Sequence, residues 1–138
     1  MKTQQINSWG PRSASYWFTA LVAVGIILLG LRFMLAPNAG ADGFGISLPH
    51  TSEAIAYGWI KGIRDIYSGI VVLIFLILRK PRATAFAFGA AIIIPASDFF
   101  TVLSINGAKD MSHLLIHGIT AVYMIVTTIF LFKATPKN

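Results

Sequence analysis

The residues in this chain that are best able to do chemistry are ionisable side chains that interrupt long apolar runs. They are the six residues Lys61, Arg64, Asp65, Asp98, His113 and His117. An ionisable group inside a hydrocarbon-length segment is costly unless it is paired or hydrated, so such groups usually bind, move or transform something. Carboxylates and imidazoles placed together would suit acid–base chemistry.

The composition indicates that the elements carrying these residues lie in a membrane. Of the 138 residues, 56% are hydrophobic and 12% are charged, whereas soluble domains average about 25% charged residues. The length allows one domain, residues 1–138. The net charge is +6, but the basic residues lie at the ends of apolar segments, so they indicate membrane anchors and no nucleic-acid binding. The absence of cysteine excludes disulfides and thiolate metal sites.

Four apolar segments are long enough to cross a bilayer, for which a helix needs about 20 residues. They cover about residues 13–35, 54–78, 83–105 and 111–132. We predict an all-α fold, a transmembrane four-helix bundle, because strands would leave backbone groups unpaired in lipid. The first segment has an alternative, a secretory signal cleaved near Ala39-Gly40-Ala41. Its apolar run exceeds the usual length of about 7–15 residues, which favours a retained helix.

The distribution of basic residues predicts the orientation of the spans. Lysine and arginine gather in the two terminal tails and in the short connection with Arg79, Lys80 and Arg82. The positive-inside rule therefore places both termini and this connection in the cytoplasm. We expect a multi-pass integral membrane protein of a bacterial inner membrane or a eukaryotic endomembrane.

The only long connection runs from Ala36 to Glu53 and is rich in glycine and proline. It contains Phe44. A connection of this length favours a functional role, such as a lid with an apolar plug, although a plain surface connection is the alternative.

This topology places the ionisable residues in the outer half of the membrane. At about 1.5 Å per residue, Lys61, Asp98 and His117 lie about 10 Å from the outer ends of their spans. Arg64 and Asp65 lie deeper, and Arg32 and His113 lie near the outer rim. At about 100° per residue, one arc of the second span contains Tyr57, Lys61, Arg64, Asp65 and Ser68. Lipid does not solvate such a face, so we expect it to point into the bundle.

Two further features bear on the third and fourth spans. Pro95 lies one turn before Asp98 and removes a backbone donor, which can open the helix where Asp98 projects. His113 and His117 at i, i+4 could share a zinc or iron ion, with Asp98 or Asp65 as a third ligand. Neighbouring Lys61 and Arg64 would repel a cation, and the chain has no Glu-x-x-His pair, so we predict no metal and no other cofactor.

Three short islands resemble a domain-of-unknown-function family of small four-span membrane proteins found in bacteria and in fungal gene clusters. The islands are Gly62-Ile63-Arg64-Asp65, Pro95-Ala96-Ser97-Asp98 and His117-Gly118. The resemblance covers roughly Ala36 to Phe132 and includes Phe44-Gly45. It implies a four-helix bundle, gives no established reaction, and points by matching position at Arg64, Asp65, Asp98 and His117.

The leading functional hypothesis is a membrane enzyme that performs acid–base chemistry, such as isomerisation, cyclisation or hydration, on a lipophilic molecule. Asp98 or Asp65 would exchange the proton, His117 would be the partner acid or base, and Arg64 would stabilise a developing oxyanion. We expect substrate contacts from four further residues, Tyr57, Lys61, His113 and Phe44.

Two other classes of function remain open. The same carboxylates and histidine could form a proton relay in a transport or binding protein, which at this length would require a homo-oligomer. A scaffold subunit could instead use the polar cluster only to fix the register of its helices. Membrane lipid is an expected partner in all three cases. The sequence does not name the substrate, and it leaves open whether the chain is an enzyme.

Overall fold

A computed structural model describes residues 9–135 and is all-helical, with no strand in that range. The six helices are α1 (Ala14–Leu35), α2 (Pro37–Phe44), α3 (Ser52–Ile77), α4 (Pro81–Ala90), α5 (Ile93–Asn106) and α6 (Met111–Lys133). The predicted all-α fold is therefore confirmed. The predicted bounds of the first, second and fourth segments agree with α1, α3 and α6 to within two residues.

Proline and glycine set several of the helix ends. Ala36, with φ −145° and ψ 71°, lies outside the helical region and separates α1 from α2, because the following proline disfavours a helical conformation there. Pro37 and Pro81 are the first residues of α2 and α4, where their missing N–H groups have no intrahelical partner to lose. Gly45 ends α2 with φ +102°, a left-handed conformation that glycine adopts without steric cost. Thr51 caps α3 by accepting a hydrogen bond from the Ala54 N–H.

The third predicted span is not one continuous helix. It is interrupted at Ala91 and Ile92, between α4 and α5. Pro95 has no N–H to donate to the Ala91 carbonyl four residues earlier, and Ile94 donates to that carbonyl instead. The expected opening therefore lies one turn before Pro95, and it separates α4 from the helix that carries Asp98.

Three helical segments are long and apolar enough to cross a membrane, by length and composition, within the described part of the chain. They are Ala14–Leu35, Pro81–Asn106 and Met111–Lys133. The second of these combines α4 and α5. α3 has 26 residues, but it is not among the three, and it carries Lys61, Arg64 and Asp65 near its middle.

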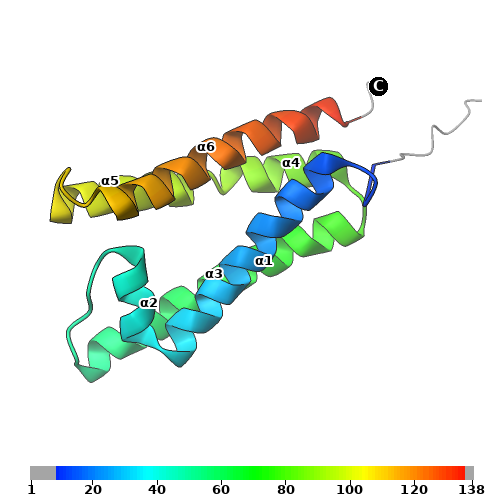
Figure 1. Cartoon of the computed structure of the whole chain (residues 1–138). Helices are drawn as coiled ribbons and strands as arrows, with labels where there is room; N and C mark the ends of the chain where they lie inside the picture. The colour runs from blue at the N-terminus through cyan, green and yellow to red at the C-terminus, as the bar shows by residue number, and fades with distance from the viewer. Residues whose placement is uncertain (1–8, 136–138) are drawn as a thin grey trace, which may run out of the picture.

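The helices form two pairs (Figure 1). In one pair α1 packs against α3, and in the other α6 packs against α4 and α5. The pairs meet through the contacts of α3 with α4 and of α1 with α6. Toward the other end of the molecule they diverge, and α2 lies against α1 and α3 there. The main buried cluster combines Ala23, Val72, Leu76, Phe88 and Leu131, among others, so the core lies where the pairs meet.

Glycines allow the backbones of α1 and α3 to approach closely. A Cβ atom on Gly62 would lie 2.6 Å from the Gly30 carbonyl oxygen, and one on Gly69 would lie 2.5 Å from the Ala23 carbonyl oxygen. Such distances leave no room for a side chain. Close packing through small residues is how helices associate where both are surrounded by lipid.

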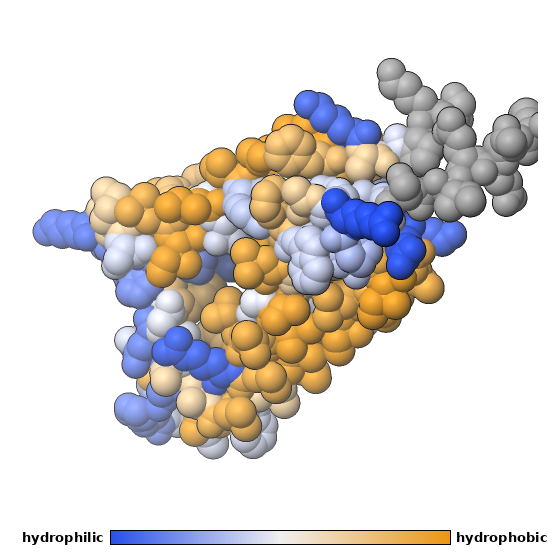
Figure 2. All heavy atoms as spheres, turned by 45° about the vertical axis from the view of Figure 1, so that its right-hand side comes forward, coloured by the Kyte–Doolittle hydropathy of each residue, from blue (hydrophilic) through white to orange (hydrophobic). Residues whose placement is uncertain are grey.

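The outer faces of the helices are apolar (Figure 2). Large hydrophobic side chains on α1 and α6 remain more than half exposed, including Leu21 at 67%, Leu28 at 60% and Ile119 at 62%. In Figure 2 hydrophobic residues cover much of the visible face, and hydrophilic residues gather toward its ends. An exposed apolar surface of this extent suits a lipid environment.

Candidate functional site

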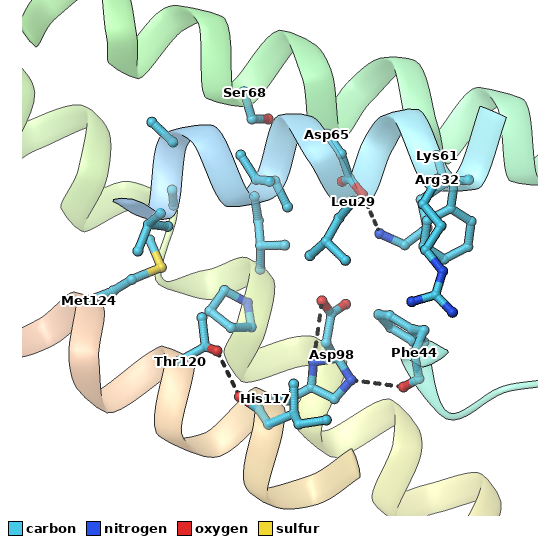
Figure 3. Close-up of a pocket in the computed structure, with 18 of the residues that line it drawn as sticks. Leu29, Arg32, Phe44, Lys61, Asp65, Ser68, Asp98, His117, Thr120 and Met124 are labelled. Atoms are coloured by element: carbon cyan, nitrogen blue, oxygen red, sulfur yellow. Dashed lines mark hydrogen bonds and ion pairs between the residues drawn. The ribbon is translucent and has the colours of Figure 1, made fainter. Parts of the chain in front are cut away.

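A cavity of about 160 Å³ lies between the two helix pairs, with α2 at one end. Residues from all six helices or their junctions line it. Its polar lining consists mainly of five ionisable side chains, Arg32, Lys61, Asp65, Asp98 and His117, most of which are visible together in Figure 3. Side chains from both pairs therefore face one space.

His117 links the second helix pair to α2. Its Nε2 lies 2.9 Å from the Phe44 carbonyl oxygen. A carbonyl oxygen only accepts, so Nε2 carries the proton of this hydrogen bond. Nδ1 faces Asp98, whose Oδ2 lies 4.0 Å away, as the dashed lines of Figure 3 show. The backbone of α2 thus favours a proton on Nε2 and leaves Nδ1 facing Asp98.

Asp98 and His117 are differently exposed within this pair. The His117 side chain is 10% exposed and the Asp98 side chain 26%. A separation of 4.0 Å is longer than a direct hydrogen bond. Both groups line the cavity, so an atom of a bound molecule or a water can contact both of them.

A second ionic pair lies on the opposite wall, within α3. Lys61 Nζ donates to Asp65 Oδ2 at 2.7 Å, and these side chains are 32% and 10% exposed. Lys61 Nζ also lies 4.7 Å from the centre of the Phe33 ring and 5.1 Å from that of Phe44, distances at which a cation is attracted to an aromatic face. Lys61 is therefore held between a carboxylate and two aromatic rings.

The remainder of the cavity lining is apolar. It includes Ala23, Ile26, Val72, Phe88, Ile94 and Met124. These residues lie on the side nearer the buried core, and several belong to the core or contact it. The cavity therefore has a polar end near α2 and an apolar end near the core, which suits a molecule with the same division.

The first half of the connection that contains Phe44 forms the helix α2, whereas residues 45–51 are not helical. The Phe44 ring lies 4.6 Å from the His117 ring and 6.3 Å from the Phe33 ring, measured between centres. Gly40 allows α2 to approach Phe33, because a Cβ there would lie 3.1 Å from that ring. Phe44 thus lines the cavity from the end of α2.

Arg64 and Tyr57, two predicted site residues, do not line the cavity. Both are exposed, Tyr57 at 71%. The reason is the rotation of α3, which turns Gly62 toward α1 and so directs the adjacent face, with Asp65, into the cavity. Arg64 is about 100° from Asp65 around the helix. The expected arc was therefore too wide, and its far edge faces outward.

His113 belongs to a separate cluster beside the cavity. Its Nδ1 lies 2.7 Å from Asp110 Oδ1, and Asn106 donates to Asp110 Oδ2 at 2.6 Å. Asn106 also donates to the Gly45 carbonyl oxygen, which ties the end of α2 to the α5–α6 turn. The hydrogen bond from Asn106, and after it that from His113, holds the pKa of Asp110 below its ordinary value. His113 is not among the residues that line the cavity.

Arg32 lies in the site, although the sequence predicted only that it lies near the outer rim of the membrane. Arg32 lines the cavity from α1, and Figure 3 shows its guanidinium beside the Phe44 side chain, at the end of the cavity where Lys61 also lies. It is the only charged residue of α1. That isolation within an apolar segment was the available signal.

The ligands expected of a metal site do not converge. Within residues 9–135, no group of three or more histidine, aspartate or glutamate side chains is placed to hold a metal ion. His117 faces Asp98, whereas His113 faces Asp110. The two histidines are therefore engaged with different carboxylates.

Residues 23–131 match a family model described as Domain of unknown function (DUF4267). The match spans most of the chain. The chain belongs to the DUF4267 family. No curated protein and no solved structure matches the chain.

The islands that suggested a family resemblance fall inside the DUF4267 match and have a common structural pattern. Each contains a residue that shapes a helix or its packing and a neighbouring residue that faces the cavity. Gly62 packs on α1 beside Asp65, and Pro95 interrupts the helix before Asp98. In the third island, a Cβ on Gly118 would lie 3.4 Å from the Phe99 ring, next to His117. The three islands thus bring Asp65, Asp98 and His117 to one cavity.

Proposed function

We propose that this DUF4267 protein is a membrane enzyme that performs acid–base chemistry on a lipophilic molecule in the cavity between its helix pairs. The observation that carries this proposal is the Asp98–His117 pair. Its two groups face each other at 4.0 Å in a cavity that is otherwise largely apolar. A carboxyl and an imidazole so placed can take and return protons near neutral pH.

The two groups have distinguishable roles in this reaction. The Phe44 carbonyl holds the proton on His117 Nε2, so Nδ1 and the Asp98 carboxyl are the positions that exchange protons with a bound molecule. In an isomerisation, one of them removes a proton from a carbon atom and the other delivers a proton to a second atom. No net proton is consumed. In a hydration, the base takes a proton from water as the water oxygen bonds to one carbon of a double bond, and the acid protonates the other carbon.

The proposal includes four membrane spans with both termini in the cytoplasm. α3 is long enough to be the fourth span, and the direction of Lys61 and Asp65 into the cavity keeps these two charges away from lipid. Arg64 would then face lipid or a second copy of the chain from the outer side of α3. The polar end of the cavity would lie in the outer half of the membrane.

Solvent deuterium tests the chemistry without knowledge of the substrate. The full-length protein in vesicles is incubated in D2O with an organic-solvent extract of cells, and lipophilic molecules are analysed by mass spectrometry. Isomerisation, cyclisation and hydration can each place a solvent hydrogen on carbon. We expect a molecule that gains deuterium in the presence of the wild type. The rate of this uptake should be lower by at least about 100-fold with Asp98→Asn, as is typical of a lost acid–base group.

Asp42→Asn is the matched control, because Asp42 on α2 is exposed and accepts a hydrogen bond from Ser47, which follows the helix. It should leave the deuterium uptake unchanged. Thermal unfolding of each variant in detergent separates loss of chemistry from loss of structure. Equal uptake by the wild type and a folded Asp98→Asn protein would show that the pair does no proton transfer.

The second candidate is a non-catalytic scaffold subunit. It is favoured by the position of His117, which connects α6 to α2 through Phe44 and faces Asp98 on α5. A purely structural role predicts that His117→Gln and Asp98→Asn lower the free energy of unfolding and that function falls only in proportion. Measured stability against activity for both variants distinguishes the two candidates.

A further inference from the structure

Arg32 is the cation of the cavity that lacks an acidic partner. Lys61 is paired with Asp65 at 2.7 Å, whereas no carboxylate lies within ion-pair distance of Arg32 among residues 9–135. The guanidinium rests against α2, where a Cβ on Gly43 would lie 3.1 Å from one of its terminal nitrogens. It lines the cavity while part of the residue is exposed, as expected at a mouth.

The other charges of the lining leave Arg32 uncompensated in one protonation state. Lys61 and Asp65 balance each other, and Asp98 is balanced when His117 carries a second proton. In that state the lining has a net charge of +1, located at Arg32. When the pair gives up that proton, Asp98 offsets Arg32. An anion at the mouth would therefore complete the charge of the proton-loaded site.

The remainder of the cavity limits the part of such an anion that lies beyond its charged group. Beyond the polar end the lining is apolar and extends to Val72, Phe88 and Met124. The cavity of about 160 Å³ extends from Arg32 on α1 to Met124 on α6 between mainly apolar side chains. That shape and lining suit a hydrocarbon chain that lies along the cavity.

We infer that the molecule bound in this cavity is a single-chain amphiphile with a carboxylate head, which Arg32 binds while the chain extends toward Met124. The inference rests on the proposed function and names the substrate class of the same site. A planar guanidinium matches a carboxylate with two parallel hydrogen bonds. The Asp98–His117 pair then lies beside the first carbons of the chain, between the head and the apolar end of the cavity.

Equilibrium binding of three probes with equal chains tests the inference. Radiolabelled decanoate, decanol and decylamine are each measured against the full-length protein in phosphatidylcholine nanodiscs, with empty nanodiscs subtracted. We expect decanoate to bind at least tenfold more tightly than decanol, and decylamine to bind most weakly. Arg32→Gln should weaken decanoate binding about 10- to 100-fold, as for a lost hydrogen bond to a charged group, and change decanol binding less than threefold.

Two further variants make the result specific. Arg82→Gln removes an exposed arginine at the start of α4 and should leave all three affinities unchanged. Arg32→Lys keeps the charge without the planar fork and should recover part of the decanoate affinity. Circular dichroism of each variant establishes that its helices are intact. Phosphatidylglycerol in the nanodisc should not compete with decanoate, and competition would instead assign the anion site to membrane lipid.

The outcomes separate this inference from the function on which it rests. Equal binding of decanoate and decanol, or equal loss of both in Arg32→Gln, overturns the carboxylate head while the deuterium experiment still stands. Decanoate binding that depends on Arg32, with no deuterium uptake by any molecule, overturns the enzyme and retains the site. Absence of binding by all three probes overturns the inference.

Discussion

Gly30→Ala offers a direct test of how the wall of the cavity is built. Gly30 lies where α1 crosses α3, two residues before Arg32 and facing Gly62. A Cβ atom at Gly30 would lie 2.5 Å from the Gly62 carbonyl oxygen and 2.8 Å from an Ile66 side-chain carbon. Because the nearest atom is backbone, no rotamer change can remove the clash, and the two helices would have to separate by about 1 Å to restore ordinary contact.

The expected cost follows from two opposing terms. Overpacking of a tight interface costs about 1–3 kcal/mol, and a backbone obstacle indicates about 3 kcal/mol. Alanine is favoured over glycine within a helix by about 1 kcal/mol. The net change is a loss of about 2 kcal/mol in the free energy of unfolding, together with a shift of Arg32 relative to Lys61.

Gly25→Ala supplies the control on the same helix, because a Cβ at Gly25 meets no atom within 4 Å. It should keep the helix-propensity gain and stabilise the protein by up to about 1 kcal/mol. Chemical denaturation in detergent, followed by circular dichroism, measures both. If Gly30→Ala proved as stable as Gly25→Ala, the close approach of α1 to α3 would be wrong, and with it the orientation of α3 that directs Asp65 into the cavity.

Two further predictions concern the α2 end of the cavity. Phe44→Ala should lower the free energy of unfolding by about 2 kcal/mol, less than the 3–5 kcal/mol of a fully buried phenylalanine, because Phe44 is half-buried. Hydrogen exchange across α2 should become faster, and unchanged exchange would contradict the packing of Phe44. Asp110, whose folded pKa lies below the ordinary value, contributes stability above that value and loses it as the pH falls toward the lowered pKa. The melting temperature should therefore decrease as the pH is lowered below about 4. This decrease should be shallower in Asp110→Asn. Identical pH profiles for the variant and the wild type would show that the hydrogen bond from Asn106 to Asp110 is unimportant.

The helices were predictable from sequence because long apolar runs have few other solutions. α1 and α6 coincide with the predicted segments almost to the residue. α2 was not predicted as a helix, because Gly40 and Gly43 give it low helix propensity, and its stability comes from Pro37 at its start and its packing on Phe33. An opening of the helix caused by Pro95 was predicted, but the break before α5 lies one turn before Pro95.

The site was predictable in part. The sequence did not predict the rotation of each helix about its own axis. Asp65, Asp98, His117 and Lys61 line one cavity, in agreement with their predicted depth, and Phe44 of the long connection lines it with them. Arg64 shares the depth of Asp65, but sequence periodicity alone does not say which edge of a polar arc faces inward. That edge is decided by glycine contacts between α1 and α3, which involve a second helix. Arg32 was left out of the predicted site because its depth placed it near the outer rim. The sequence does not give the direction of its side chain.

The divergence of the two helix pairs makes the molecule resemble a pair of levers joined at one end. α1 is about 33 Å long at 1.5 Å per residue. A rotation of about 5° between the pairs at the joined end would therefore move their far ends apart by about 3 Å. The hydrogen bonds that α2 makes to His117 and Asn106 lie at those far ends. These hydrogen bonds join the second helix pair to α2, which packs on the first pair, so they resist that rotation where it would separate the pairs.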